Sequence, residues 1–337
     1  PAGSAGGGRQ EVAQLAEQKR QLFRGVCYSW FFAVVAHTLN LQSEAILIRN
    51  ACGGDLGRNA KVVSQCNAVA GLLGIVVNQV GGRLSDALGR KPFYMLGPVA
   101  QLLAGAVVFA RPGSLRALVG SKLVRGVFTT FSGTVIGTAC LRDCFEGRDL
   151  GVKVAEAGGV VGIGIMVGPL IEGLLLRKAK GHGERLSYLI LGLLGIANAL
   201  IALGTPETLK QTSRAALEPV AMLRSANPFG FARLYTQGTA TLKKLATIQT
   251  LQSMIDGKTM SDLSQIWMRE HLRLSVESIR NFVMGFGLLS AMAGKQLTPV
   301  LLKRTSAWSY TTLTNTTNLV AFGLRGMYER AEVFFGV

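Results

Sequence analysis

The sequence predicts an all-α protein whose helices cross a membrane several times. Of its 337 residues, 49% are hydrophobic and 16% are charged, whereas a soluble domain usually has about 25% charged residues. The 42 glycines are typical of membrane helices that pack closely. Since lipid offers no hydrogen-bond partners, apolar segments of about 20 residues must satisfy their backbone groups as helices.

Six such segments are predicted in the first two thirds of the chain. Short polar turns separate them, so consecutive helices are expected to run antiparallel. The six lie at residues 26–48, 62–81, 92–110, 115–141, 152–176 and 187–205.

A polar segment with several bases then precedes three more apolar segments, at residues 245–267, 276–302 and 307–326. This order predicts four regions: a flexible N-terminal segment 1–25, a six-helix bundle 26–208, a polar linker 209–244, and a partial bundle 245–337. Two bundles of six spans built from three-helix repeats are an architecture of secondary transporters. On that plan the last three spans are absent, and we expect a fragment or a processed chain.

The net charge of +17 does not indicate a nucleic-acid protein. Lys and Arg fall mostly in short stretches between the apolar segments, where they suit lipid headgroups rather than one basic face. With Lys122 counted among the loop residues, the bases of the N-terminal segment and the short loops divide evenly between the two sides, and only the bases of the central linker favour a cytoplasmic N-terminus. The five cysteines form no metal-binding framework. No cofactor, metal or catalytic residue is predicted, and the protein is not expected to be an enzyme.

The turn between the second and third segments, "GGRLSDALGRKPFY", is unusually dense in charge. Glycines allow a tight reversal of two helices. Asp86 at a helix end could bind a cation or cap a neighbouring helix N-terminus. Arg90 and Lys91 are suited to the lipid headgroups.

This turn resembles the signature loop of the major facilitator superfamily. Two further motifs resemble that family: Leu123–Gly126 with an intramembrane Arg125, and an antiporter motif in the fifth segment, in which Ala155 and Glu172 replace two glycines. The resemblance implies a charged cytoplasmic gate in which Arg90 pairs with Asp143. Its residues would be Gly82, Asp86, Gly89, Arg90, Lys91, Asp143 and Arg148, and those of the antiporter motif Gly164, Gly168, Pro169 and Gly173.

The segment Gly204–Thr208 and two later stretches resemble the tetracycline-exporter-like, drug:proton antiporter subgroup. The resemblance implies a multi-pass membrane transporter that exports small organic solutes by alternating access, coupled to protons. Its partners would be a small-molecule substrate, protons and the lipid bilayer, with no nucleic acid. A non-transporting subunit of a larger membrane complex is the alternative, and the plasma membrane and an organellar membrane both stay open.

Polar residues inside spans are candidates for substrate or proton binding. His37, Asn40 and Glu44 would share one face of the first helix, at positions i, i+3 and i+7. Asp256 and Asp262 are the acids of the seventh segment. The resemblance implies that these two spans line a central cavity. Interhelical hydrogen bonds, or a helix end in water, remain open for each of them, and Glu44 lies close to Arg49 at the expected interface.

Overall fold

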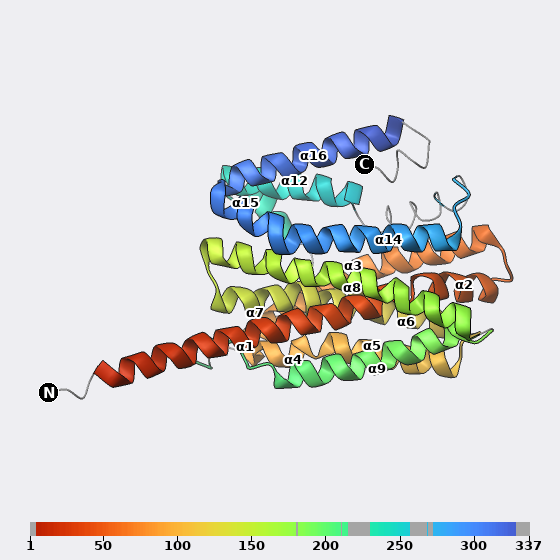
Figure 1. Cartoon of the computed structure of the whole chain (residues 1–337), viewed down its shortest axis with the longest axis horizontal. Helices are drawn as coiled ribbons and strands as arrows, with labels where there is room; N and C mark the ends of the chain where they lie inside the picture. The colour runs from red at the N-terminus through yellow and green to blue at the C-terminus, as the bar shows by residue number, and fades with distance from the viewer. Residues whose placement is uncertain are drawn as a thin grey trace.

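A computed structural model describes residues 5–179, 181–209, 211–214, 230–256, 268 and 272–327. These residues form helices joined by short turns, and none of them lies in a strand. The long helices lie side by side with roughly parallel axes (Figure 1). The all-α class of the sequence prediction is confirmed.

The first span consists of two helices, α1 (Ala5–Thr38) and α2 (Leu41–Ala51). The prediction of a flexible segment 1–25 is wrong from Ala5 onward, because good helix formers such as Ala, Gln, Glu and Lys follow the glycines. The span is interrupted at Leu39 and Asn40. Just before this break the Thr38 Oγ1 donates to the Val34 carbonyl at 2.9 Å, an interaction that often bends helices.

The other helices of the first half agree with the predicted segments. Asp55 caps the N-terminus of the helix of residues 56–88, which covers the second predicted segment, since its Oδ1 accepts a hydrogen bond from the Gly57 N–H at 2.8 Å. A π-helical turn, η1, interrupts the fourth span, which is otherwise continuous. The helices are α3 (Leu56–Leu88), α4 (Arg90–Tyr94), α5 (Leu96–Ala110), α6 (Leu115–Thr130), η1 (Phe131–Ile136), α7 (Gly137–Cys144), α8 (Gly147–Lys178) and α9 (Gly183–Gly204).

The later part of the chain is also helical where it is described. The predicted seventh span, 245–267, coincides only in part with α12, and residues 257–267 lie outside the described residues. The elements are η2 (Gln211–Ser213), η3 (Gly230–Ala232), α11 (Arg233–Thr236), α12 (Ala240–Asp256), α14 (Val276–Met292), η4 (Ala293–Leu297), α15 (Thr298–Arg304) and α16 (Ala307–Met327).

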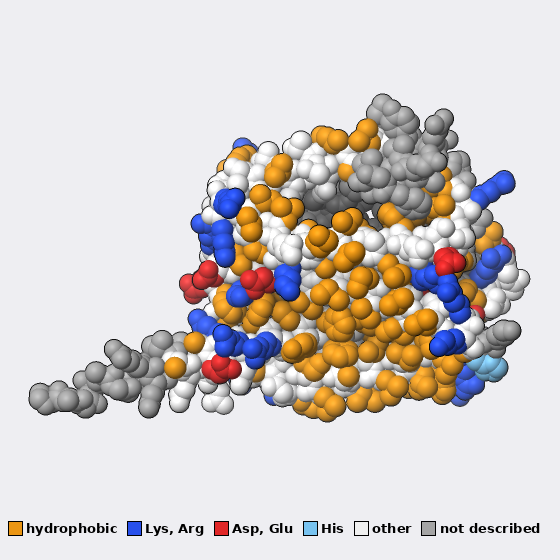
Figure 2. Space-filling model, viewed as in Figure 1, with side chains coloured by type: hydrophobic (Ala, Val, Ile, Leu, Met, Phe, Trp, Pro, Cys, Tyr) orange, Lys and Arg blue, Asp and Glu red, His pale blue; other side chains and the backbone are white. Residues whose placement is uncertain are grey.

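Five helical segments of the described chain are long and apolar enough to cross a membrane: 16–51, 56–88, 90–110, 147–178 and 183–204. Figure 2 shows hydrophobic side chains over the middle of the molecule, with Lys, Arg, Asp and Glu gathered toward the two ends of the helices. A bundle that spans a bilayer requires this distribution, because charge is costly in hydrocarbon.

Glycine contacts hold the helices close together. A Cβ added at Gly105 of α5 would lie only 2.5 Å from the backbone nitrogen of Gly192 on α9. At the boundary with the later helices, a Cβ at Gly287 of α14 would lie 2.8 Å from the Gly162 carbonyl oxygen on α8. Helices that meet through small residues gain dispersion contacts that lipid cannot replace.

Candidate functional site

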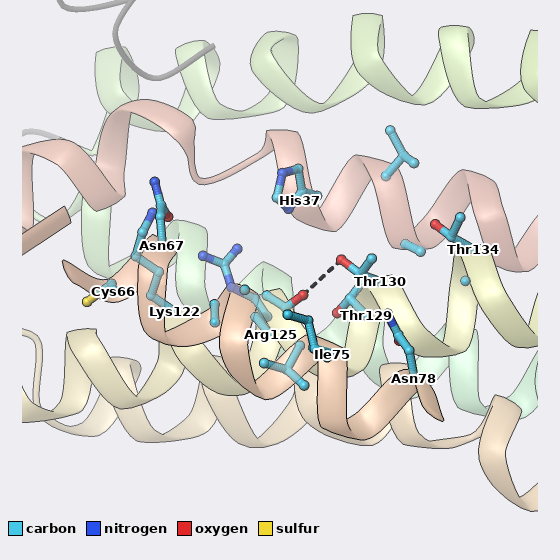
Figure 3. A pocket seen from close by; sticks show the side chains of 18 of the residues that line it. His37, Cys66, Asn67, Ile75, Asn78, Lys122, Arg125, Thr129, Thr130 and Thr134 are labelled. Atoms are coloured by element: carbon cyan, nitrogen blue, oxygen red, sulfur yellow. Dashed lines mark hydrogen bonds between the residues drawn. The ribbon is translucent and has the colours of Figure 1, made fainter. Parts of the chain in front are cut away.

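A cavity of about 680 Å³ lies among the helices of the first half. It is lined by α1, α3, α6 and η1, with Val161 contributed by α8. Much of the lining is apolar. The polar side chains on it are His37, Asn67, Asn78, Lys122, Arg125, Thr129, Thr130 and Thr134, and Figure 3 shows how they lie around the cavity.

A buried cluster of three charges lies beside this cavity. The Glu44 carboxylate of α2 pairs with both Lys122 and Arg125 of α6, and the Lys122 Nζ lies 2.5 Å from the Glu44 Oε1. The three side chains are 12%, 10% and 9% exposed, in that order. Buried charges are retained when they are paired in this way. Within the described residues, the Nε and Nη1 of Arg125 have no hydrogen-bond partner.

The structure brings some of the predicted first-span residues to this site and not others. His37 lines the cavity, and Glu44 reaches its two cations from α2. The expected continuous face of His37, Asn40 and Glu44 is wrong, because the helix breaks at Leu39 and Asn40. Asn40 is buried in this break, 1% exposed.

Lys122 is the charged residue of the cavity that the sequence prediction missed, and the neutral polar residues Asn67, Asn78, Thr129, Thr130 and Thr134 were not predicted either. The assignment of Lys122 to a loop is wrong, because it lies inside α6 and lines the cavity. The available signal was its spacing of three residues from Arg125, which places both cations on one helix face.

The glutamate that departs from the antiporter motif has a structural partner. Glu172 of α8 is 1% exposed, and its carboxylate accepts hydrogen bonds from the backbone N–H groups that begin α2. The Ser43 nitrogen lies 2.6 Å from Oε1, and the Gln42 nitrogen lies 3.1 Å from the same oxygen. The carboxylate thus caps a helix N-terminus that the break left inside the protein.

The other residues of that motif lie along α8, facing two neighbouring helices. A Cβ at Gly164 would lie 3.2 Å from the Phe31 carbonyl oxygen, and one at Gly168 would lie 2.9 Å from the Leu39 nitrogen. Gly173 instead faces the Arg280 side chain of α14. Pro169 is buried inside α8, which continues through it.

A second charged cluster occupies the end of the bundle where α3 meets α4. The Arg90 Nε lies 3.2 Å from the Asp143 Oδ2, and the same guanidinium pairs with Asp86. Its Nη1 also donates to the Ser85 Oγ at 2.7 Å. Gly89 has a φ of 106°, which favours glycine. A Cβ added at Gly82 would have no described atom within 4 Å apart from its chain neighbours and the adjoining backbone of α3.

Glu207, just after α9, supplies the helix cap that the sequence suggested for Asp86. Its carboxylate accepts from the backbone N–H of Arg90 at 2.9 Å and of Lys91 at 3.1 Å. Burial acts to raise the pKa of Glu207, but the hydrogen bonds donated by Lys91, Arg90, Leu209 and Thr208 outweigh it and lower the pKa. The Lys91 Nζ donates to the Leu203 carbonyl at 2.6 Å, so Lys91 also joins α4 to α9.

Arg148 lies at the start of α8 and contacts a later helix. Its Nε donates to the Leu302 carbonyl of α15 at 2.7 Å. At the opposite end of α8, Arg177 pairs with Glu277 of α14. Of the two acids predicted in the seventh span, Asp262 lies outside the described residues. Asp256 is the last residue of α12, and its side chain also lies outside the described part.

Comparison with known proteins places these features in a family. The family model of the Major Facilitator Superfamily matches residues 28–324. The chain belongs to the Major Facilitator Superfamily. It is therefore an integral, multi-pass membrane protein of a transporter family, and the predicted membership is confirmed at this level.

Several transporters of the superfamily are similar to parts of this chain. An uncharacterized MFS-type transporter, YdgK, of Bacillus subtilis is 31% identical over 48% of this chain and 39% of its own length. A bicyclomycin resistance protein homolog of Haemophilus influenzae is 29% identical over 40% of this chain and 32% of its own. The matched part thus spans about two fifths or less of these curated relatives.

A solved structure supports the fold over a longer range. The human organic anion transporter MFSD10 (TETRAN) has a TM-score of 0.70, with 94% of this chain and 80% of that chain covered. Its sequence identity to this chain is 17%, so the likeness concerns the fold.

Proposed function

We propose that this chain is a secondary transporter of small organic solutes that works by alternating access. The observation that carries the proposal is the cavity of about 680 Å³, which combines an apolar lining with two buried cations. Small-molecule sites are typically concave and mostly apolar, with a few polar groups that fix orientation, and measure about 300–1,000 Å³.

In this proposal the six helices of residues 26–208 move as one bundle against the partial bundle 245–337, about the linker 209–244. The contact of Arg148 with Leu302 joins the two bundles at one end of the helices and would open and close. The ion pair of Arg90 with Asp143 lies within the first bundle at the proposed cytoplasmic gate and would hold the loop between α3 and α4 in place there. Glycine contacts between α8 and α14 would provide the surface on which the two bundles rock.

The finer parts of the proposal are export and coupling to protons. The antiporter-like motif of α8 favours them. Two relatives carry names consistent with export, a bicyclomycin resistance protein homolog and a probable actinorhodin transporter of Streptomyces coelicolor. Glu44, and Asp256 of the predicted seventh span, are the proposed proton carriers. His37, Asn40 and Asp262 remain proposed substrate or proton residues.

The test is solute flux in proteoliposomes that contain the full-length gene product. Radiolabelled aromatic solutes of similar size, one anionic, one neutral and one cationic, are loaded with and without a pH gradient. We expect one class to move faster than in empty liposomes, and to accumulate only with the gradient. Flux that ignores the gradient, and survives Glu44→Gln and Asp256→Ala, would exclude proton antiport. The absence of any protein-dependent flux would contradict transport itself.

A further inference from the structure

We infer that the cavity binds the anionic group of its solute at Arg125 and Lys122, and that Glu44 is an internal competitor for these two cations. The inference rests on the proposed function and names the substrate class: a small organic anion with an apolar body.

The charged side chains that line the cavity are both cations. Both Lys122 and Arg125 are lining residues, whereas no Asp or Glu of the described chain lines it. Glu44 touches the two cations from α2 and is not itself part of the lining. Among the groups in direct ionic contact, one carboxylate therefore stands against two cations, and an anion in the cavity would be attracted to both cations.

Arg125 has buried hydrogen-bond donors that Glu44 does not use. A guanidinium has five N–H donors, and Glu44 contacts it through Nη2. The side chain is nine-tenths buried, and in the described part of the chain its Nε and Nη1 find no acceptor. Buried donors without a partner are costly, and the carboxylate of a solute could accept a charge-assisted hydrogen bond from either of these nitrogens.

The rest of the lining indicates the body of the solute. Beyond the two cations the cavity is bounded by Trp30, Val34, Ile75 and Val161, with Asn78 and Thr134 as neutral polar groups. Figure 3 shows Arg125 and Lys122 toward one side of the site and Asn78 and Thr134 toward the other. An aromatic or branched apolar body would bury its surface here while its anionic end meets the cations.

The experiment measures equilibrium binding to the full-length protein in lipid nanodiscs by calorimetry. Three probes of similar shape differ in charge: benzoate, benzamide and phenyltrimethylammonium. We expect benzoate to bind at least about tenfold more tightly than the other two. We expect Arg125→Gln and Lys122→Gln each to weaken benzoate binding about tenfold or more, and Glu44→Gln to strengthen it. Arg58→Gln, which removes an exposed cation on α3, is the charge-matched control and should change little.

Each alternative result is informative. Absent benzoate binding, equal binding of the three probes, or a benzoate preference that survives Arg125→Gln would overturn the inference. So would a preference for phenyltrimethylammonium that Glu44→Gln abolishes, because the carboxylate would then be the ligand-binding group. If Glu44→Gln does not fold, Glu44→Gln/Lys122→Gln keeps the charge balance and should bind benzoate, whereas Glu44→Gln/Arg125→Gln should not.

Binding and flux separate this inference from the proposed function. Charge-selective binding without flux of any solute would contradict transport and leave the anion site standing. Flux of neutral or cationic solutes, with no selectivity for benzoate, would leave transport standing and overturn the anion site.

Discussion

The carboxylate of Glu172 on α8 accepts a hydrogen bond from the backbone N–H of Ser43 at the start of α2, with a nitrogen-to-oxygen distance of 2.6 Å. This hydrogen bond joins the antiporter-like motif to the break in the first span. Because α2 also carries Glu44, the position of Glu172 fixes the helix that presents a counter-ion to Lys122 and Arg125.

Replacing Glu172 by the glycine that the motif usually has should destabilise this protein. The N–H groups of Gln42 and Ser43 would lose their buried acceptor, and an unsatisfied buried donor costs about 1–3 kcal/mol. Glu172→Gln keeps one carbonyl acceptor and should lose less. Thermal unfolding in detergent measures both, with Asp149→Asn, an exposed acid of the same helix, as the control. Equal unfolding temperatures for Glu172→Gly and the parent protein would contradict the capping role.

The ion pair of Arg90 and Asp143 should show energetic coupling. Their side chains are 12% and 18% exposed, so water screens the pair less than an exposed one. In a double-mutant cycle of Arg90→Gln and Asp143→Asn, we expect a coupling energy of about 1 kcal/mol. The measurement is the free energy of unfolding of the four proteins. Additive effects would show that the contact contributes nothing by itself, and a charge exchange, Arg90→Asp with Asp143→Arg, should recover part of the loss.

We predict that the folded protein loses stability in acid through the protonation of Glu207. Its pKa is lowered in the folded protein by hydrogen bonds from α4 and its own segment, which outweigh the effect of burial. The folded form therefore binds the proton less readily than the unfolded chain, and the stabilisation is present above the unfolded pKa, about 4.3. It is lost as the pH falls through the folded pKa.

The measurement is the unfolding temperature of the parent protein and of Glu207→Gln between pH 7 and pH 3. The parent protein should be the more stable at pH 7, and the difference should shrink on acidification. A difference that stays constant over this range would show that the charge of Glu207 is not responsible.

Gly287 should tolerate no side chain, whereas Gly285 should accept one. A Cβ at position 287 would lie 2.7 Å from the Met166 nitrogen on α8, so the backbones must separate. A Cβ at position 285 meets nothing of the described chain within 4 Å. We expect Gly287→Ala to cost about 1–3 kcal/mol, while Gly285→Ala is neutral or stabilising because alanine favours the helix. Thermal unfolding compares the two, and equal effects would contradict the close contact of α8 with α14.

Much of the fold could be predicted because each segment that crosses lipid must satisfy its backbone hydrogen bonds within itself. Segments such as 187–205 show their helices through composition alone, since about 20 apolar residues in hydrocarbon must be helical. The break at Leu39 and Asn40 could not be predicted, because it depends on an acceptor from another helix. Glu172, 129 residues from Ser43 in the chain, supplies that acceptor.

The candidate site was predictable only in part for the same reason. Arg125 was identified, because an arginine inside a span needs a partner or a cavity. The partner, Glu44, could not be assigned to it from helical spacing, since the contact joins α2 and α6. Lys122 counts as a loop base in the sequence prediction although it falls inside the predicted segment 115–141, and its burial against Glu44 depends on how the two helices pack.

The sequence by itself determined that this is a helical membrane protein of the Major Facilitator Superfamily, and where most of its helices lie. These properties depend on residues close together in the chain: apolar runs, tight glycine turns and short motifs. The tertiary structure alone decided several contacts of charged groups that neither helical spacing nor a motif indicates. The contacts of Glu44 with Lys122 and Arg125, of Glu172 with α2 and of Glu207 with α4 each join distant segments. Each of these contacts depends on the distance in space between segments far apart in the chain, and local sequence does not encode that distance.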